Sequence, residues 1–222
     1  MKYIPIYKMT RSILVITAAI TLLASSCKKT AYLTDGGTSV ARTPLSTYDY
    51  LKAHPYHYFD TVLLIIDHFN LKDSVNKSGT FFAFTDYSVH TLMTLWNYTS
   101  LDSLYAHVSS RFLTQYMFSD SSLSLANATT AAVIRPDWAG DSATAAIRKI
   151  QKSYPVYLVN SSPTFNYYTL QYIKVNGVLD NSPGAPASDP PDTYISCQTT
   201  GILTSSGTTL HVLVDNAPLN KL

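Results

Sequence analysis

Two neighbouring histidines are the first residues in this sequence that could hold a metal ion. His54 and His57 stand three positions apart in the segment HPYH. On a helix this spacing would place both imidazoles on one face, where they could share a zinc ion. Pro55 interrupts such a helix, because proline removes a backbone donor and clashes with the preceding turn. No cysteine or acidic residue stands at a spacing typical of zinc sites, so we expect no metal site.

The residue types of a hydrolase are present, but without a pattern that assembles them. Asp67-His68 and many serines supply an acid, a base and nucleophiles, while no G-x-S-x-G segment presents a serine. All 14 acidic residues are Asp, which disfavours reactions built on paired carboxylates without excluding them. We therefore expect no catalytic residues and no cofactor. The alternative, an enzyme, would need a pocket in which an Asp and a His converge.

A run of aromatic residues offers binding rather than catalysis. The segment FNYYTLQY spans residues 165–172 and contains Tyr167, Tyr168 and Tyr172. Exposed aromatic side chains stack on sugar rings or anchor protein interfaces. Tyrosine is also favoured in ordinary strands, and both interpretations stay open. Side chains alternate along a strand, so Tyr167 and Tyr168 should point to opposite faces. These three tyrosines are our candidate binding surface.

The amino terminus carries a pattern typical of exported proteins. Basic residues come first, and a 12-residue apolar run covers residues 13–24. This run is too short to span a bilayer, which needs about 20 apolar residues, and it has the form of a signal peptide. The following LLASSC resembles the cleavage site of bacterial lipoproteins. That resemblance implies cleavage after residues 1–26 and lipid attachment to Cys27, although an ordinary signal peptide followed by a chance cysteine stays open.

Lipidation would determine where the chain resides. Two or more acyl chains hold a protein durably, at ~0.8 kcal/mol per buried methylene. Lys28 follows Cys27, where an Asp is associated with inner-membrane retention, so we expect a partner in membrane lipid and anchoring at the outer membrane. Removing residues 1–26 leaves 13 basic against 14 acidic residues, a formal charge of −1, and we expect no nucleic-acid partner. Cys197 would then have no disulfide partner.

The rest of the chain divides into a helical half and a strand-rich half. Residues 27–44 lack periodicity and predict a flexible tether, which leaves residues 45–222 as one domain. Apolar spacing then predicts short helices, with one buried strand at residues 80–84. The expected helices are 45–51, 59–66, 71–75, 89–96 and 101–108. In the second half, residues rich in Tyr, Val, Ile and Thr predict strands. These strands are 153–161, 165–177, 193–203 and 208–215, with a proline-rich loop at 182–192. Helices followed by strands indicate an α+β domain built around an antiparallel sandwich.

Two motifs and the order of these elements resemble the fasciclin (FAS1) family. The first motif is TFFAFTDYSV, residues 80–89, and the second is SSGTTLHVLVD, residues 205–215. The matching positions are Thr80, Phe82, Ala83, Thr85, Asp86, Gly207, His211, Val212 and Asp215. The resemblance covers residues 45–219. It implies a β-sandwich flanked by several short helices, and a non-catalytic adhesion or binding module for a protein or a glycan.

The first motif should form a structural corner. Phe82 and Phe84 would share one face of the strand, and Thr85 or Asp86 would cap the helix that follows, where a lost cap costs ~1 kcal/mol. We expect His211 to be a half-buried strand histidine with satisfied hydrogen bonds rather than a ligand. An alternative function is a glycan-binding accessory lipoprotein of an outer-membrane uptake system, with Tyr167 to Tyr172 as its aromatic platform.

Overall fold

The first part of the folded chain is mainly helical. The computed structural model describes residues 41–140, 144–155 and 164–219. Its helices are α2 (Thr47–Lys52), α3 (Asp60–His68), α4 (Lys72–Lys77), α5 (Asp86–Leu95), α6 (Leu101–Tyr105) and α7 (Arg111–Thr114). The helices predicted from apolar spacing are confirmed, with shifted boundaries. Helix α7 was not predicted, because a single turn cannot display a periodic pattern.

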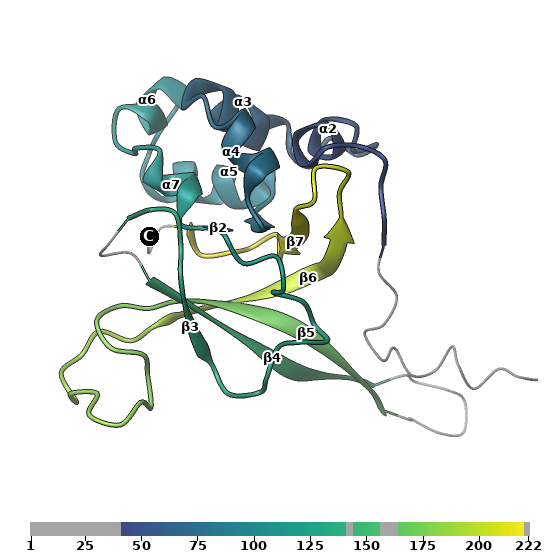
Figure 1. Ribbon diagram of the computed structural model, residues 1–222. Coiled ribbons are helices and arrows are strands. Elements are labelled where there is room, and N and C mark those ends of the chain that lie inside the picture. Colours follow the sequence, from purple (N-terminus) through teal and green to yellow (C-terminus); the bar gives the residue numbers. More distant parts are fainter. Residues whose placement is uncertain (1–40, 141–143, 156–163, 220–222) are drawn as a thin grey trace, which may run out of the picture. The chain divides into compact units, whose positions relative to one another are not determined.

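The strands form one curled sheet with helices packed against part of it, so the predicted α+β class is confirmed (Figure 1). They are β1 (Thr80–Ala83), β2 (Met117–Phe118), β3 (Val133–Pro136), β4 (Thr144–Pro155), β5 (Thr164–Lys174), β6 (Thr193–Leu203) and β7 (Thr209–Leu213). Their order is β2-β1-β7-β6-β5-β4-β3. The sheet is mixed rather than purely antiparallel, because β1 runs parallel to β7. That pairing joins segments far apart in the sequence, as a parallel connection requires.

Strand prediction succeeded where β-branched and aromatic residues are dense. β1, β5, β6 and β7 lie within a few residues of their predicted ranges. β4 begins at Thr144, well before the predicted start at residue 153. Its early part contains Ile147 and Ile150, but the two alanines and three basic residues among them carry little strand propensity and hid the strand in the sequence. Residues 156–161 of that prediction lie outside the described residues. The short strands β2 and β3 were not predicted.

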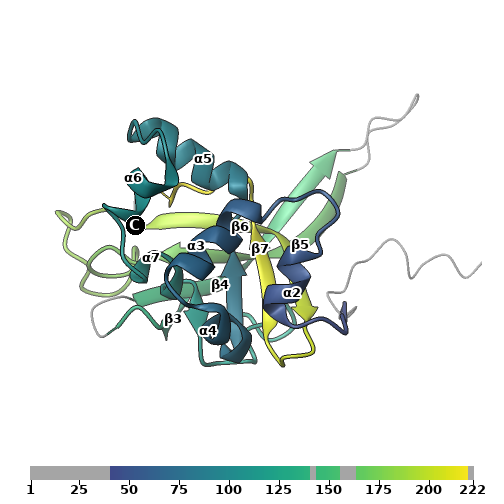
Figure 2. The same cartoon turned by 90° about the horizontal axis from the view of Figure 1, so that it is seen from above.

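Strand β6 changes partners along its length and so bends the sheet. Its first residues pair with β5, ending at Ser196 opposite Gln171, and its later residues pair with β7, starting at Cys197 opposite Leu213. Register shifts near Thr199 accompany the change. Such bulges increase local twist. As a result β7, β1 and β2 lie near the helices, while the ends of β4 and β5 project away from them (Figures 1 and 2).

A cluster of aromatic rings fills the core between the helices and the sheet. Phe82 lies 5.8 Å from Tyr172, and Tyr172 lies 5.0 Å from Tyr116, measured between ring centroids. Phe84 lies 5.3 Å from Tyr116. All four rings are fully buried, and the chain of contacts agrees with Phe82 of β1 and Phe84, one residue beyond its end, pointing to the same side. A smaller cluster around Ile173 occupies the other face of β5.

Residues 41–44 pack onto the sheet, although the sequence suggests that they belong to the tether. Arg42 forms an isolated bridge with Leu203 at the end of β6. The backbone N–H of Thr43 donates to Leu203 O at 3.0 Å, and the N–H of Leu203 donates to Ala41 O at 2.8 Å. The packed domain therefore extends to residue 41.

Candidate functional site

Asp86 of the first motif caps a helix, but not the expected one. Its Oδ2 and Oδ1 accept hydrogen bonds from the backbone N–H groups of Thr61 and Val62, at 2.9 and 3.0 Å. Those donors lie in the first turn of α3. The N-cap residue of α5 is Thr85, whose side chain makes no capping bond. The predicted local cap is therefore wrong, because the unsatisfied donors of α3 are brought to the same corner by tertiary packing.

His211 of the second motif is paired with the first motif in the core. It lies opposite Phe82 in the parallel β1–β7 ladder, with ring centroids 4.7 Å apart. His211 Nε2 lies 2.8 Å from Leu123 O, and the N–H of Gly201 donates to Nδ1 at 3.1 Å, which fits a neutral ring protonated on Nε2. Burial lowers the pKa of His211 to about 4. The expected hydrogen bonds are present, but the ring is fully buried rather than half-buried.

The remaining motif residues also support the fold. Thr80 Oγ1 donates to Asp120 O at 2.6 Å, and Ala83 pairs with Val212 inside the sheet. Gly207 turns the chain between β6 and β7 with a φ of 88°, a left-handed conformation that glycine adopts without strain. The contacts of Thr80, Ala83 and Gly207 therefore all lie within the fold.

The candidate tyrosines separate into a buried one and two exposed ones. Tyr172 is fully buried, and its hydroxyl donates to Gln115 O at 3.3 Å. Its inclusion in the binding surface was therefore wrong, because the ring lies in the aromatic core against Phe82, Tyr116 and Phe118. Tyr167 and Tyr168 are 44% and 42% exposed. The β4–β5 register places them on opposite faces, as alternation predicts.

The outer parts of β4 and β5 form a two-stranded ribbon that is largely exposed. We define the outer ribbon as residues 151–155 and 164–168. Cross-strand pairing puts Tyr154 beside Phe165 and Lys152 beside Tyr167, on one face. Tyr168 lies on the opposite face, beside Gln151. Within the described residues, β6 pairs with β5 only from Gln171 onward, so the ribbon also has a backbone edge without a partner strand.

A second aromatic surface lies between α2 and α3. Tyr56 is 71% exposed and stacks on Tyr58 at 5.6 Å, and Tyr58 stacks on His54 at 5.1 Å. Of these residues, the sequence singled out only His54, as a candidate metal ligand. Their stacking depends on the turn at His57, whose φ is positive, and no sequence pattern announces it.

The two histidines of HPYH do not share a site. His54 Nδ1 is buried without a hydrogen-bond partner, whereas His57 Nδ1 lies 3.2 Å from the exposed Asp60 carboxylate. Among the residues that the structure describes, no group of three or more potential ligands is close enough to hold a metal ion. The three cavities whose lining residues are described, around Phe112, Leu123 and Pro186, each lack an Asp–His pair.

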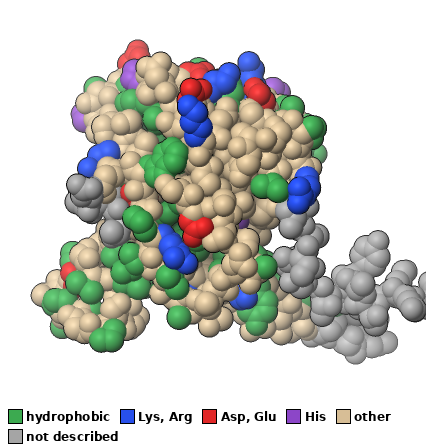
Figure 3. Space-filling model, viewed as in Figure 1, with side chains coloured by type: hydrophobic (Ala, Val, Ile, Leu, Met, Phe, Trp, Pro, Cys, Tyr) green, Lys and Arg blue, Asp and Glu red, His purple; other side chains and the backbone are tan. Residues whose placement is uncertain are grey.

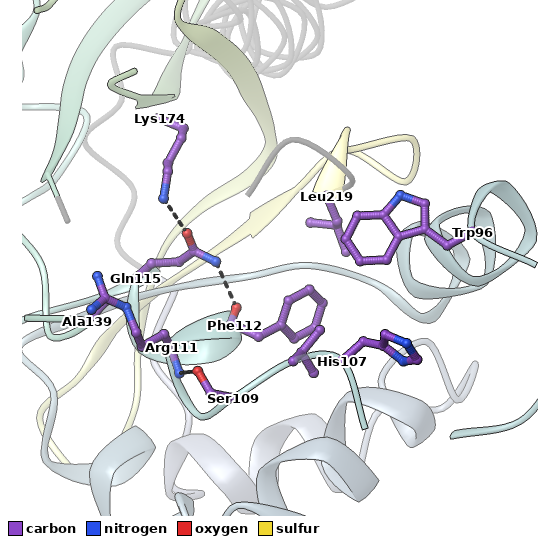
Figure 4. A pocket seen from close by; sticks show the side chains of 10 residues that line it. Trp96, His107, Ser109, Arg111, Phe112, Gln115, Ala139, Lys174 and Leu219 are labelled. Carbon is purple, nitrogen blue, oxygen red and sulfur yellow. Dashed lines mark hydrogen bonds between the residues drawn. The ribbon is translucent and has the colours of Figure 1, made fainter. Parts of the chain in front are cut away.

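A cavity of about 240 Å³ lies where α7, the carboxyl end of α5 and the inner end of β5 meet. Figure 4 shows two different walls: Arg111, Gln115 and Lys174 on one side, and Trp96, Phe112 and Leu219 on the other. No pattern in the sequence indicates this cavity, because its lining comes from separate segments with no common motif.

Hydrogen bonds hold the polar wall of this cavity in place. Lys174 Nζ donates to Gln115 Oε1 at 2.8 Å, and Gln115 Nε2 donates to Phe112 O at 3.1 Å. Burial lowers the pKa of Lys174, an effect that the Asp137 carboxylate opposes. Burial also raises the pKa of Asp137 to about 6, while Lys174 and Arg111 oppose that shift. Among the described residues, Lys174 forms no ion pair.

Of the two cysteines, the structure describes only Cys197. Cys27 lies outside the described residues. Cys197 is a free, buried thiol, and burial raises its pKa, so it has no reactive thiolate at neutral pH. No helix in the described part of the chain has the length and apolar character needed to cross a bilayer.

The visible surface shows no dominant charge. On the face in Figure 3, acidic and basic side chains are interspersed, and hydrophobic side chains gather mainly over the strands and the loop that follows β5.

Comparisons with known proteins gave no match: no family model, no curated protein and no solved structure matches this chain.

Proposed function

We propose that the chain is a non-catalytic binding module that engages a protein or glycan outside the inner membrane through its outer ribbon. In this proposal residues 1–26 are removed, Cys27 carries lipid, and the protein is held at the outer membrane. The fold is of the fasciclin type. The observation that carries the proposal is the exposure of aromatic side chains on both faces of the outer ribbon.

The arrangement of the two motifs supports the fasciclin assignment. They are separated by more than a hundred residues in sequence, yet β1 and β7 pair with each other directly, Thr80 opposite Thr209 and Phe82 opposite His211. Because the two motifs form neighbouring strands of one sheet, each would need the other to complete this strand pairing. As part of the same proposal, the curled sheet packs on itself as the sandwich of the fasciclin family.

One face of the outer ribbon has the composition of a protein-binding surface. Tyr154, Phe165 and Tyr167 form an aromatic group around Lys152. Aromatic residues dominate the energetics of protein interfaces, and they bring large contact area with few rotatable bonds. The free edge of β5 could add backbone hydrogen bonds to an extended peptide.

The opposite face favours the second candidate, a glycan-binding accessory lipoprotein of an uptake system. There Tyr168 is flanked by Gln151, and Ser153 Oγ donates to Asn166 Oδ1 at 2.7 Å. The Lys149 ammonium lies over the Tyr168 ring, 5.5 Å from its centroid. Together with the nearby amide and hydroxyl groups, this ring would provide stacking and hydrogen bonds for a sugar.

Separate variants of the two faces distinguish these functions. The mature chain with Cys27→Ser serves as bait in a pull-down from cell-envelope extract and as probe on a glycan array. Tyr154→Ser with Tyr167→Ser should weaken protein capture by about tenfold or more, and Tyr168→Ser should weaken glycan binding similarly. Tyr56→Ser, which changes a more exposed tyrosine elsewhere, is the matched control. Binding that is lost only in the Tyr56→Ser variant would reject the outer ribbon as the site.

Membrane anchoring is tested by fractionation. With Cys27→Ser the protein should move from the membrane fraction to the soluble fraction, because the acyl chains supply the membrane affinity. Cys197→Ser is the matched control and should leave the protein at the membrane. A Cys27→Ser protein that stays in the membrane fraction would contradict lipidation.

A further inference from the structure

We propose that the free edge of the outer ribbon pairs with the same edge of a second copy of this chain. The two β5 strands run antiparallel in this pairing, with Asn166 of each copy opposite Asn166 of the other, and the two ribbons become one four-stranded sheet. The inference concerns the edge of the ribbon rather than its two faces, so it goes beyond the proposed function and does not depend on it.

The hydrogen bonds of β4 show which backbone groups of β5 face this edge. The N–H of Lys149 donates to Thr129 O at 2.7 Å, so the backbone groups of Lys149 and of its cross-strand partner Leu170 point away from each other. Successive residues of a strand direct these groups to opposite sides, and the β4–β5 register is unbroken. In the outer ribbon, the residues of β5 whose N–H and C=O groups point away from β4 are therefore Thr164, Asn166 and Tyr168.

The β4 edge of the ribbon carries features that keep strands from pairing, and the β5 edge lacks them. By the same alternation Pro155 faces outward on β4, where it has no N–H to donate, and Lys149 and Lys152 place charge on that strand. Residues 164–168 of β5 contain no charged residue and no proline. The far end of β6, which has left β5, is covered by residues 41–43. The contrast indicates that the β5 edge is kept for pairing.

The spacing of the outward-pointing groups suits a second copy and fixes the register. Centred on Asn166, antiparallel pairing places Thr164 opposite Tyr168 of the other copy, so all three outward-pointing residues meet an outward-pointing partner. A centre one residue away leaves at least one of the three without a partner in the ribbon. The same register sets Phe165 opposite Tyr167 of the other copy, twice, and such aromatic pairs stabilise sheets. Because the paired segment is uncharged, no like charges meet across the symmetry axis.

The contact is short, so the dimer is weak. Five residues in each copy extend over about 17 Å, which places the interface among small, transient ones. The outer ends of β4 and β5 project away from the helices (Figures 1 and 2), and antiparallel pairing puts the two helical parts at opposite ends of the joined sheet. Both faces of each ribbon stay open. Anchoring of two copies in one membrane would raise their effective concentration and favour the pairing.

An introduced cysteine tests the pairing and its register in the mature chain with Cys27→Ser, where the remaining thiol is buried. The exposed Asn166, replaced in Asn166→Cys, should give a disulfide-linked dimer under mild oxidation, because opposed Cα atoms lie about 5.5 Å apart. Tyr167→Cys should not cross-link, because its two copies are displaced by two residues, about 6.6 Å, along the strands. Gln151→Cys, on the β4 edge, is the matched control and should stay monomeric. Absence of the Asn166→Cys dimer, or equal cross-linking of all three variants, would overturn the proposal.

Charge at the symmetry axis provides a second test without a covalent bond. Sedimentation equilibrium of the mature chain with Cys27→Ser, with no ligand added, should show reversible dimerisation as the concentration rises to about 1 mM. Asn166→Lys opposes two like charges and should weaken dimerisation about tenfold or more. Gln151→Lys adds the same charge at least about 14 Å from its copy, beyond the screening length, and should change it less than about twofold. A chain that stays monomeric throughout, or equal effects of the two variants, would refute the pairing and leave ligand binding by the faces untouched.

Discussion

Strand β5 has two halves that resemble each other in sequence and differ in environment. Residues 164–168 are exposed on both faces, whereas residues 169–173 are buried on both faces. Tyr167 and Tyr168 belong to the first half and Tyr172 to the second. The strand is continuous, so local conformation does not cause the difference.

Coverage by other elements separates the two halves. The inner half pairs with β6, and Tyr172 faces the aromatic core. On its other face Ile173 packs with Val175 and Leu179, which lie in the segment that follows the strand. Beyond Gln171, toward the outer end, β6 departs to pair with β7 and nothing described replaces it. Tyrosine therefore serves as a core residue in one half and as a candidate binding residue in the other.

The largest expected effect is on stability of the inner half. Tyr172→Ala should lower the free energy of unfolding by about 3–5 kcal/mol, the usual cost of emptying a large aromatic site in a core. Urea denaturation measures this value. A cost below about 1 kcal/mol would mean that the inner half is not buried as described.

The pH dependence of stability tests the same aromatic core at His211, whose ring stacks on Phe82. The folded-state pKa of His211 is about 4 and its unfolded value is 6.5, so between these pH values the unfolded state binds the proton. Stability from this group is therefore present above pH 6.5 and is lost as the pH falls toward 4, with a slope of at most about 1.4 kcal/mol per pH unit.

Comparison with His211→Gln isolates this contribution. Asp137, with a raised pKa of about 6, acts in the opposite direction, because the folded state holds its proton more tightly. It is present in both proteins, so it cancels in the difference between their stability curves. A variant whose acid dependence equals that of the wild type would show that His211 does not titrate as described.

The capping role of Asp86 should have a moderate effect. Asp86→Ala leaves the N–H groups of Thr61 and Val62 without acceptors and should lower the free energy of unfolding by about 1 kcal/mol. Asp86→Asn keeps one acceptor oxygen and should cost less. Chemical denaturation compares the two variants; equal stability of Asp86→Ala and wild type would contradict the cap on α3.

The smallest effect is expected in the outer half. Tyr167→Ala and Tyr168→Ala should each change the free energy of unfolding by less than about 0.5 kcal/mol, as exposed substitutions usually do. The same denaturation series as for Tyr172→Ala makes the contrast direct. A loss of several kcal/mol at either position would remove the distinction between the halves.

The sequence predicted those helices and strands that are determined by the residue pattern of their own segment. Apolar spacing identified most helices, and dense β-branched and aromatic residues identified β1, β5, β6 and β7. It could not predict which half of β5 is covered, since that depends on where β6 changes partners. Asp86 capping α3, the assembly of Lys174 with Trp96, and the burial of Tyr172 likewise depend on contacts between distant segments. Alternation along β5 did predict correctly that Tyr167 and Tyr168 face opposite ways.

The most direct test of the binding surface is hydrogen exchange with and without a partner captured by the mature chain. We predict that the partner slows exchange at backbone amides of residues 151–154 and 164–168, and leaves residues 54–58 unchanged. Protection at residues 54–58 with none on the outer ribbon would contradict the account.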